Sequence, residues 1–228
     1  MPSRPCCARG CPRVTTPDGY GDYCPKHARH YRRHGHPEQD PLTKGEVTRL
    51  KKYVTKLIDR RRNSPEIWDK LDSSHRALLS DLRAESLTTK VVYRGNRHKF
   101  MLLHAMEAAE AKDFILTALA ISYLHEYDSR RFKSDEAFFV SLARRILMFN
   151  RTSWSGRLTP VERKDGSRTL WKTQTYRDPA RYYSSEVGKM VAKVFYPPGV
   201  ALRQGEIRTD KMTADVLRAP VEALTLDA

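Results

Sequence analysis

The sequence predicts a mainly α-helical protein with a small zinc-binding module at its amino terminus and one β-hairpin. All four cysteines lie within the first 24 residues, apolar residues recur at helical spacing through most of the chain, and one late segment has the polar turn of a hairpin. These observations predict a basic zinc module at residues 1–38, a helical domain at 39–200 with a hairpin at about 158–176, and a C-terminal tail at 201–228.

The composition indicates a polyanionic partner. The 228 residues include 42 Lys+Arg against 27 Asp+Glu, a formal charge of +15. Residues 1–62 alone hold 15 Lys+Arg and 6 Asp+Glu, and such an excess is typical of nucleic-acid-binding proteins. The most apolar stretch, Phe114–Leu124, is too short to span a bilayer. We therefore expect no membrane partner and a cytoplasmic protein, nucleoid-associated if it is bacterial or phage-encoded.

Two helices are expected after the module. Residues 35–43 have the composition of a linker, and Thr43 with Glu46 has the spacing of a capping box, in which each side chain binds a backbone N–H of the new helix. Ser64 and Pro65 then suit the N-cap and first position of a second helix. The apolar residues at helical spacing are Val47, Leu50, Val54, Leu57 and Ile58 in the first helix and Ile67, Leu71, Leu78 and Leu82 in the second.

Three further helices are expected. Residues 98–127 predict one long helix whose second half, FILTALAISYL, is apolar on nearly all sides, as in a central core helix. Ser134 suits the N-cap of the next helix, which extends to about residue 150. A last helix opens after residues 178–179 and is expected to end at residues 197–199, Pro-Pro-Gly, because proline cannot continue a helix without losing a hydrogen bond.

The segment at residues 158–176 predicts a basic hairpin. Asp165-Gly166 is the strongest short hairpin signal in the chain, and a two-residue turn there would place Arg163 opposite Arg168. A helix at residues 134–150 followed by this hairpin has the order of a winged helix, in which a helix enters the major groove and a basic wing follows. The sequence therefore predicts a winged-helix-like arrangement in this part of the chain.

The spacing Cys6-x4-Cys11-x12-Cys24-x2-His27 is the sharpest chemical signal in the chain. Zinc takes four sulfur or nitrogen ligands in a tetrahedron, and in a reducing compartment clustered cysteines and histidines more often hold a metal than form disulfides. Cys7 is the alternative to Cys6 as the first ligand. Four protein ligands leave no position for water, so the predicted cofactor is a structural Zn²⁺.

Residues 6–37 resemble the short zinc modules of phage and mobile-element DNA-associated proteins, some of which are attached to HNH homing endonucleases. The shared pattern is C-x4-C, a glycine-containing loop, C-x2-H, an arginine-rich helix and an R-x-G-x-P ending. The match falls on Cys6, Gly10, Cys11, Gly21, Cys24, His27, Arg29, Tyr31, Arg32, Arg33, Gly35 and Pro37. This resemblance implies a zinc-bound, nucleic-acid-associated module, although Cys7 and Pro12 depart from the pattern. It does not extend to residues 40–228, where no family is recognised.

Basic residues near the module are candidates for contacts with backbone phosphates, which position a protein on a nucleic acid without reading its sequence. They follow the last ligand, continue along the next helix and recur in the predicted hairpin. The candidates are Arg29, Arg32, Arg33, Lys51, Lys52, Lys56, Arg60, Arg61, Arg62, Arg163, Lys164 and Arg168.

The sequence therefore predicts a non-enzymatic, zinc-containing DNA-binding accessory or regulatory protein of a phage or mobile element. DNA is favoured over RNA, and the helical domain is available to a protein partner. No HNH core, Walker loop or Gly-x-Ser-x-Gly motif is found, and the nearest acidic metal-binding group, His125, Glu126 and Asp128, is interpreted as a polar helix end. The alternatives are a divergent nuclease or recombination factor, and an assembly protein of a larger nucleoprotein or RNA-binding machine.

Overall fold

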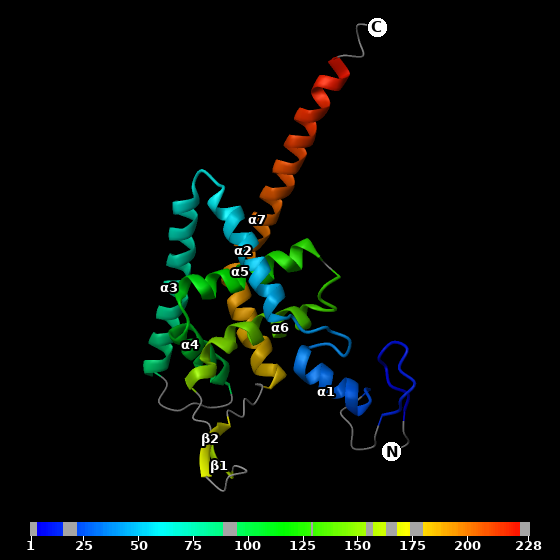
Figure 1. Ribbon diagram of the computed structural model, residues 1–228, viewed down its shortest axis with the longest axis vertical. Helices are drawn as coiled ribbons and strands as arrows, with labels where there is room; N and C mark the ends of the chain where they lie inside the picture. Colours follow the sequence, from blue (N-terminus) through cyan, green and yellow to red (C-terminus); the bar gives the residue numbers. More distant parts are fainter. Residues whose placement is uncertain are drawn as a thin grey trace.

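The computed structural model describes residues 4–15, 22–88, 95–128, 130–153, 157–162, 168–173 and 180–223. Within these residues the protein is mainly α-helical, as predicted (Figure 1). The elements in order are α1 (Pro25–His34), α2 (Lys44–Asp59), α3 (Ser64–Thr88), α4 (Arg97–Ala108), α5 (Ala111–Tyr127), α6 (Asp135–Leu147), the 3-10 helix η1 (Met148–Ser153), β1 (Arg157–Glu162), β2 (Arg168–Thr173) and α7 (Arg181–Ala223). We call α2 to α7 the helical body and residues 4–35 the amino-terminal module.

The predicted caps of α2 and α6 are confirmed. The Thr43 hydroxyl accepts a hydrogen bond of 3.1 Å from the Glu46 backbone N–H, and Glu46 accepts one of 3.3 Å from the Thr43 N–H. At the start of α6, the Ser134 hydroxyl accepts a hydrogen bond of 3.1 Å from the Ala137 N–H. These bonds satisfy backbone donors that have no partner inside the helix, and they fix where each helix begins.

Helix α5 is the centre of the helical body, as predicted. Every residue from Phe114 to Leu124 is buried, because α2, α3, α6 and α7 all pack against it. Helix α7 crosses both α5 and α6 closely, and two glycines allow this approach. A Cβ on Gly188 would lie 2.1 Å from the Phe139 carbonyl oxygen, and a Cβ on Gly199 would lie 2.7 Å from the Ser122 Cβ.

The prediction of a single long helix over residues 98–127 is wrong, because the chain forms two helices there. Ala109 and Glu110 adopt extended backbone angles, with ψ of 147° and 131°. This break lets α4 leave the line of α5 and pack on α3 and α7. The sequence gives little sign of it, because alanine and glutamate are both strong helix formers.

The prediction that the last helix ends at residues 197–199 is also wrong, because α7 continues to Ala223. Prolines inside a helix cost about 3 kcal/mol or more, so packing must offset this cost. Phe195 before the prolines and Leu202 after them are both buried in the main core, and Gly199 lies against α5. Figure 1 shows the C-terminal part of α7 projecting beyond the rest of the helical body.

Strands β1 and β2 are antiparallel neighbours, and their register differs from the predicted one. The Cα atoms of Glu162 and Arg168 lie opposite each other. The predicted pairing of Arg163 with Arg168 is therefore wrong. Asp165-Gly166, Arg163 and Lys164 lie outside the described residues, and the winged-helix-like arrangement stays a prediction.

Within the described part of the chain, no helix combines the length and apolar character that a bilayer-spanning segment requires.

Candidate metal centre

In the amino-terminal module, a short turn brings Cys6 and Cys11 together. The Cys6 N–H donates to the Arg13 carbonyl over 2.9 Å, and Pro5 and Val14 form an antiparallel bridge. Gly10 has a φ of +68°, a left-handed conformation that glycine adopts at little cost. The resulting turn directs both Cys6 and Cys11 toward the start of α1.

Helix α1 supplies the other two members of the cluster. Cys24 is the N-cap of α1 and Pro25 is its first residue, a position that suits proline because its missing N–H would have no partner there. His27 then lies in the first turn of the helix, on the same side as Cys24. The Cys24 sulfur and His27 Nδ1 are 3.5 Å apart.

The four predicted ligands converge on one point. His27 Nδ1 lies 3.4 Å from the Cys6 sulfur, and the Cys11 and Cys24 sulfurs are 4.0 Å apart. All four donor atoms lie within 4.8 Å of one another. A tetrahedron with Zn–S bonds of about 2.3 Å and Zn–N bonds of about 2.0 Å has edges of roughly 3.5–3.8 Å. The cluster therefore has both the donor set and the spacing of a Cys₃His zinc site and could hold such an ion.

The cysteine thiols are free, and the cluster does not contain a disulfide. A sulfur–sulfur distance of 4.0 Å between Cys11 and Cys24 is about twice the length of a disulfide bond. Cys7, the alternative first ligand, is exposed, whereas Cys6 is buried. The structure therefore places Cys6 in the cluster and leaves Cys7 outside it.

Backbone N–H groups around the cluster favour thiolates. The N–H of His27 is the main group that lowers the pKa of the Cys24 thiol. Burial opposes ionisation of Cys6, but the N–H groups of Cys24 and Ala8 and the His27 ring together lower its pKa. The Arg13 N–H stabilises a Cys11 thiolate, yet burial and the neighbouring cysteines outweigh it and raise the pKa of Cys11. A central cation would relieve this mutual repulsion, because metal binding deprotonates its thiol ligands.

The C-terminal end of α1 is fixed on the helical body. Gly35 ends α1 with a φ of +78° and lies against α6, so that a Cβ there would be 2.7 Å from the Glu136 carbonyl oxygen. The Arg181 guanidinium of α7 lies 4.5 Å from the centre of the Tyr31 ring. It also donates hydrogen bonds of 3.1 Å to the Tyr31 hydroxyl and to the Glu136 carboxylate. Sequence reasoning missed this contact, because nothing local to Arg181 indicates its partner 150 residues away.

The segment that follows α1 packs against the helical body as well. Gln39 is fully buried, and its side chain donates to the Arg131 carbonyl over 3.2 Å and accepts from the Lys133 N–H over 3.0 Å. Arg131 in turn bonds the carbonyls of Asp40 and Pro41 and the carboxylate of Glu46. The residues expected to link the module to the helical domain are thus held by hydrogen bonds to Arg131 and Lys133.

Helix α1 presents a basic surface between these two fixed ends. Arg29, Arg32 and Arg33, all predicted to contact nucleic acid, are exposed. They lie beside a surface hollow of about 390 Å³ lined by Arg13, Pro25, Lys26, Arg29, His30, Arg33 and His34. We call this set of lining residues, together with Arg32, the α1 surface.

The predicted basic residues of α2 fall into three situations. Lys51 is in an ion pair with Asp113 of α5, whereas Lys52 and Lys56 are exposed. Arg60, Arg61 and Arg62 lie at the opposite end of α2 from α1, where they line a cavity of about 560 Å³. The structure gives the Cα register of Arg168 but describes nothing of its side chain.

The acidic group at the end of α5 does not form a second metal site. His125 packs against Phe132, Phe138 and Tyr196, and its Nδ1 lies 3.1 Å from the Tyr196 hydroxyl. Burial, with Glu126 as hydrogen-bond acceptor, raises the pKa of Tyr196 to about 12, so this hydroxyl stays protonated as a donor. Among the described residues, only the Cys6, Cys11, Cys24 and His27 group brings three or more metal-ligating side chains together.

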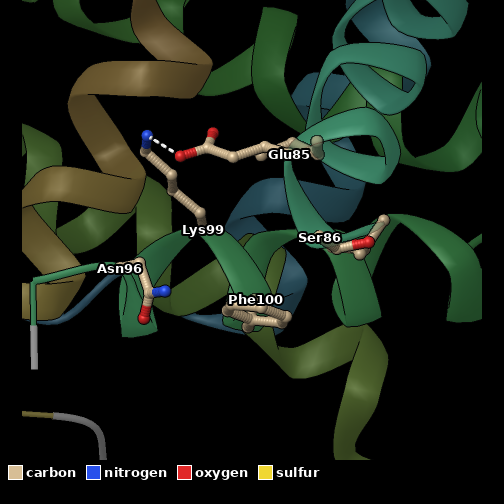
Figure 2. A pocket seen from close by; sticks show the side chains of 7 residues that line it. Glu85, Ser86, Asn96, Lys99 and Phe100 are labelled. Atoms are coloured by element: carbon tan, nitrogen blue, oxygen red, sulfur yellow. Dashed lines mark hydrogen bonds and ion pairs between the residues drawn. The ribbon is translucent and has the colours of Figure 1, made fainter. Parts of the chain in front are cut away.

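A small cavity between α3 and α4 is too confined for a ligand. Figure 2 shows its lining, in which Lys99 of α4 forms an ion pair with Glu85 of α3. The cavity measures about 10 Å³, which is close to the minimum space for one water molecule. We therefore exclude it as a substrate site.

Comparisons with known proteins find no relative for this chain. No protein-family model matches it, and neither a curated protein nor a solved structure shows significant similarity. Its function must therefore be inferred from its own residues.

Proposed function

We propose that the protein is a non-enzymatic DNA-binding accessory or regulatory protein, of the kind that phages and mobile elements encode. In this proposal a structural Zn²⁺ on Cys6, Cys11, Cys24 and His27 fixes the amino-terminal module, and the α1 surface binds backbone phosphates. The observation that carries the proposal is that the exposed arginines of α1 lie on a helix fixed at both ends. The cluster holds its start, and Gly35 and Tyr31 hold its end.

Fixed arginines suit this role for an energetic reason. A flexible basic tail loses conformational entropy when it binds, whereas residues on an anchored helix are already ordered. Guanidinium groups donate several hydrogen bonds in a planar fork that matches phosphate oxygens. Arg29 and Arg33 are one turn apart on α1 and share one hollow with Lys26 and Arg13, so several phosphates of one strand can be bound together.

The resemblance of residues 6–37 to zinc modules of phage and mobile-element proteins supports DNA as the nucleic acid. In the proposal Zn²⁺ takes no part in chemistry, because all four tetrahedral positions are filled by protein side chains. The helical body supports α1 through Arg181 and Glu136, and its remaining surface is available to a protein partner. Sequence readout, if the complex has any, must come from contacts to base edges in addition to these phosphate contacts.

Salt dependence of DNA binding tests the proposal. Affinity for a short duplex should fall steeply as salt rises, because each phosphate contact releases a counterion. Replacing Arg29, Arg32 and Arg33 together by Gln should reduce the slope of log K against log salt by about three, roughly 0.9 for each phosphate that is no longer neutralised. The matched control replaces Lys70, Arg130 and Lys193 by Gln, which removes the same charge from exposed positions away from α1.

Three results would contradict the proposal. Binding that barely changes with salt would exclude the phosphate contacts, and equal weakening in the two triple variants would reduce the effect to net charge. Cleavage of labelled DNA in Mg²⁺ that one acidic substitution abolishes would favour the nuclease alternative. Clear preference for RNA over DNA of the same sequence would favour the assembly-protein alternative.

A further inference from the structure

A second basic site lies at the corner where α2 meets α3, separate from the α1 surface. Arg60, Arg61, Arg62 and Asn63 line a cavity of about 560 Å³ there, together with Tyr53 and Leu57 of α2 and Gly205 and Glu206 of α7. We call these lining residues the corner site. In Figure 1 this corner lies beside the part of α7 that leaves the helical body. Helix α2 has 16 residues, so its length of about 24 Å separates the corner site from the end of α2 nearest the module.

Within the described part of the chain, the charges of the three arginines are not neutralised by an ion pair. No ion pair or side-chain hydrogen bond involves Arg60, Arg61 or Arg62 there. The nearby Asp59 carboxylate accepts a hydrogen bond from the Trp68 ring nitrogen over 3.2 Å and is not part of the lining. Three adjacent guanidinium groups around one cavity repel one another, and a bound anion would relieve that repulsion.

Glu206, the one carboxylate of the corner site, is already neutralised by its own neighbours. It is in an ion pair with Arg203 and accepts hydrogen bonds from the Tyr53 and Tyr123 hydroxyls. Burial opposes its charge, but these three donors together lower the pKa of Glu206, so it is ionised and paired at neutral pH. The negative charge of Glu206 is therefore compensated by Arg203. The positive charges of Arg60, Arg61 and Arg62 remain available to a ligand.

Arg61 extends to α7. A Cβ on Gly205 would lie 2.2 Å from Nη2 of Arg61, so the guanidinium lies against the helix at a position that has no side chain. This contact places the Arg61 guanidinium between the end of α2 and α7, at the wall of the cavity.

We propose that the corner site binds phosphate groups, through Arg60, Arg61 and Arg62 around the anion and with Asn63 as a neutral donor. Phosphate fits better than a carboxylate, because it has more acceptor oxygens and more charge to share among three planar forks. Two sources carry this chemistry, a nucleic-acid backbone and a free nucleotide. The site does not depend on the proposed role of α1, since the two share no residue.

Titration calorimetry with pyrophosphate, at fixed ionic strength set by chloride, tests the site. The wild-type chain should bind pyrophosphate, and replacing Arg60, Arg61 and Arg62 together by Gln should weaken binding more than about tenfold, the equivalent of at least one charge-assisted hydrogen bond. The matched control replaces Lys44, Arg49 and Lys70 by Gln. It removes the same charge from exposed positions of α2 and α3 outside the cavity and should bind like wild type.

The variant Gly205→Ala tests the geometry without changing any charge. It should weaken pyrophosphate binding severalfold because the new methyl group displaces Arg61. The thermal midpoint should not fall, since alanine favours a helix more than glycine does. The proposal is wrong if the wild-type chain does not bind pyrophosphate. It is also wrong if Gly205→Ala or the triple variant at Arg60, Arg61 and Arg62 binds pyrophosphate as tightly as wild type.

Competition identifies the source of the phosphate. Displacement of pyrophosphate by ATP alone assigns the site to a free nucleotide, and displacement by duplex DNA assigns it to a nucleic-acid backbone. The triple variant at Arg29, Arg32 and Arg33 separates this proposal from the preceding one. It should lose affinity for DNA and keep pyrophosphate binding, so that failure of one proposal leaves the other open to its own test.

Discussion

The amino-terminal module and the helical body differ in what lies at their centres. The buried apolar cluster of the module consists of Cys6, Ala8 and Cys24, with Cys11 and Tyr23 packed against it. That of the helical body includes large side chains such as Phe114, Tyr123 and Phe195 and draws on every helix from α2 to α7. Burial of apolar surface stabilises a fold by about 25 cal/mol per Å². Burial of apolar surface can therefore stabilise the fold of the helical body, whereas the module is too small to be stabilised in this way alone.

The difference teaches where each part of the molecule is vulnerable. Removing an ion should affect the module first, and removing a large side chain should affect the helical body first. Gly35 and Arg181 join the two parts, so a change there should loosen the module while leaving both centres intact. The following experiments, in order of decreasing effect, test this division.

Metal removal should have the largest effect. A structural zinc contributes apparent binding energy of about 10 kcal/mol or more in small zinc domains, so a strong chelator should abolish the amide-exchange protection of residues 4–15 and 22–35. Protection in α5 should persist. Cys24→Ser should have the same effect as the chelator, whereas Cys7→Ser should not, because Cys7 is exposed outside the cluster. Unchanged protection in the chelated chain would mean that the module needs no metal.

Truncating the core of the helical body should come second. Phe195 is fully buried and packs edge-on against Phe114 with ring centres 6.0 Å apart. Phe195→Ala should lower the free energy of unfolding by about 3–5 kcal/mol, the sum of reduced burial and a residual cavity. Chemical denaturation measures this decrease. The metal content of the folded variant should equal that of the wild-type chain, and a lower content would show that the module depends on the core of the helical body.

Loosening the junction should come third. Gly35→Ala introduces a side chain at a φ of +78° and within 2.7 Å of the Glu136 carbonyl oxygen, and the expected decrease in the free energy of unfolding is about 2–3 kcal/mol. Hydrogen exchange should locate that decrease at α1 and the start of α6. The control Gly45→Ala meets no atom within 4 Å, and it should leave stability equal or higher.

The smallest effect should be a pH-dependent one at Glu46. The Arg131 guanidinium holds the pKa of the Glu46 carboxyl below its usual range. Because the folded pKa lies below the unfolded one, its contribution is present above about pH 4.5 and disappears as pH falls through the folded pKa. At pH 7, Glu46→Gln should cost about 1 kcal/mol, as expected for a partly exposed pair. The cost should shrink as pH falls below about 4.5, and a cost that stays constant as the pH falls would exclude the ion pair as its source.

Local chemistry explains what could be predicted from the sequence. The capping box at Thr43 and Glu46, the cap at Ser134 and the Cys₃His cluster all depend on residues close together in the chain. Each group forms its bonds within a few residues or at a chelating spacing, so the pattern is visible without the fold. The choice between Cys6 and Cys7 could not be made in this way, because both spacings permit a ligand.

Long-range packing explains what could not be predicted. Helix α7 passes through Pro197 and Pro198 because Phe195 and Leu202 are buried on both sides of them, a benefit visible only once α5 and α7 are packed. The break at Ala109 and Glu110 likewise has no local signal. The sequence alone groups residues 60–62 with the arginines of α1, and the corner site is visible only once the fold sets Gly205 beside Arg61.

Helix α7 also sets a distance. Its 43 residues, at about 1.5 Å each, measure about 65 Å. Arg181 at its first turn bonds Tyr31 of α1, and its last turns stand clear of the helical body (Figure 1). A molecule bound at the C-terminal end of α7 would therefore lie about 65 Å from α1. Each residue inserted into the projecting part of α7 would increase this distance by about 1.5 Å.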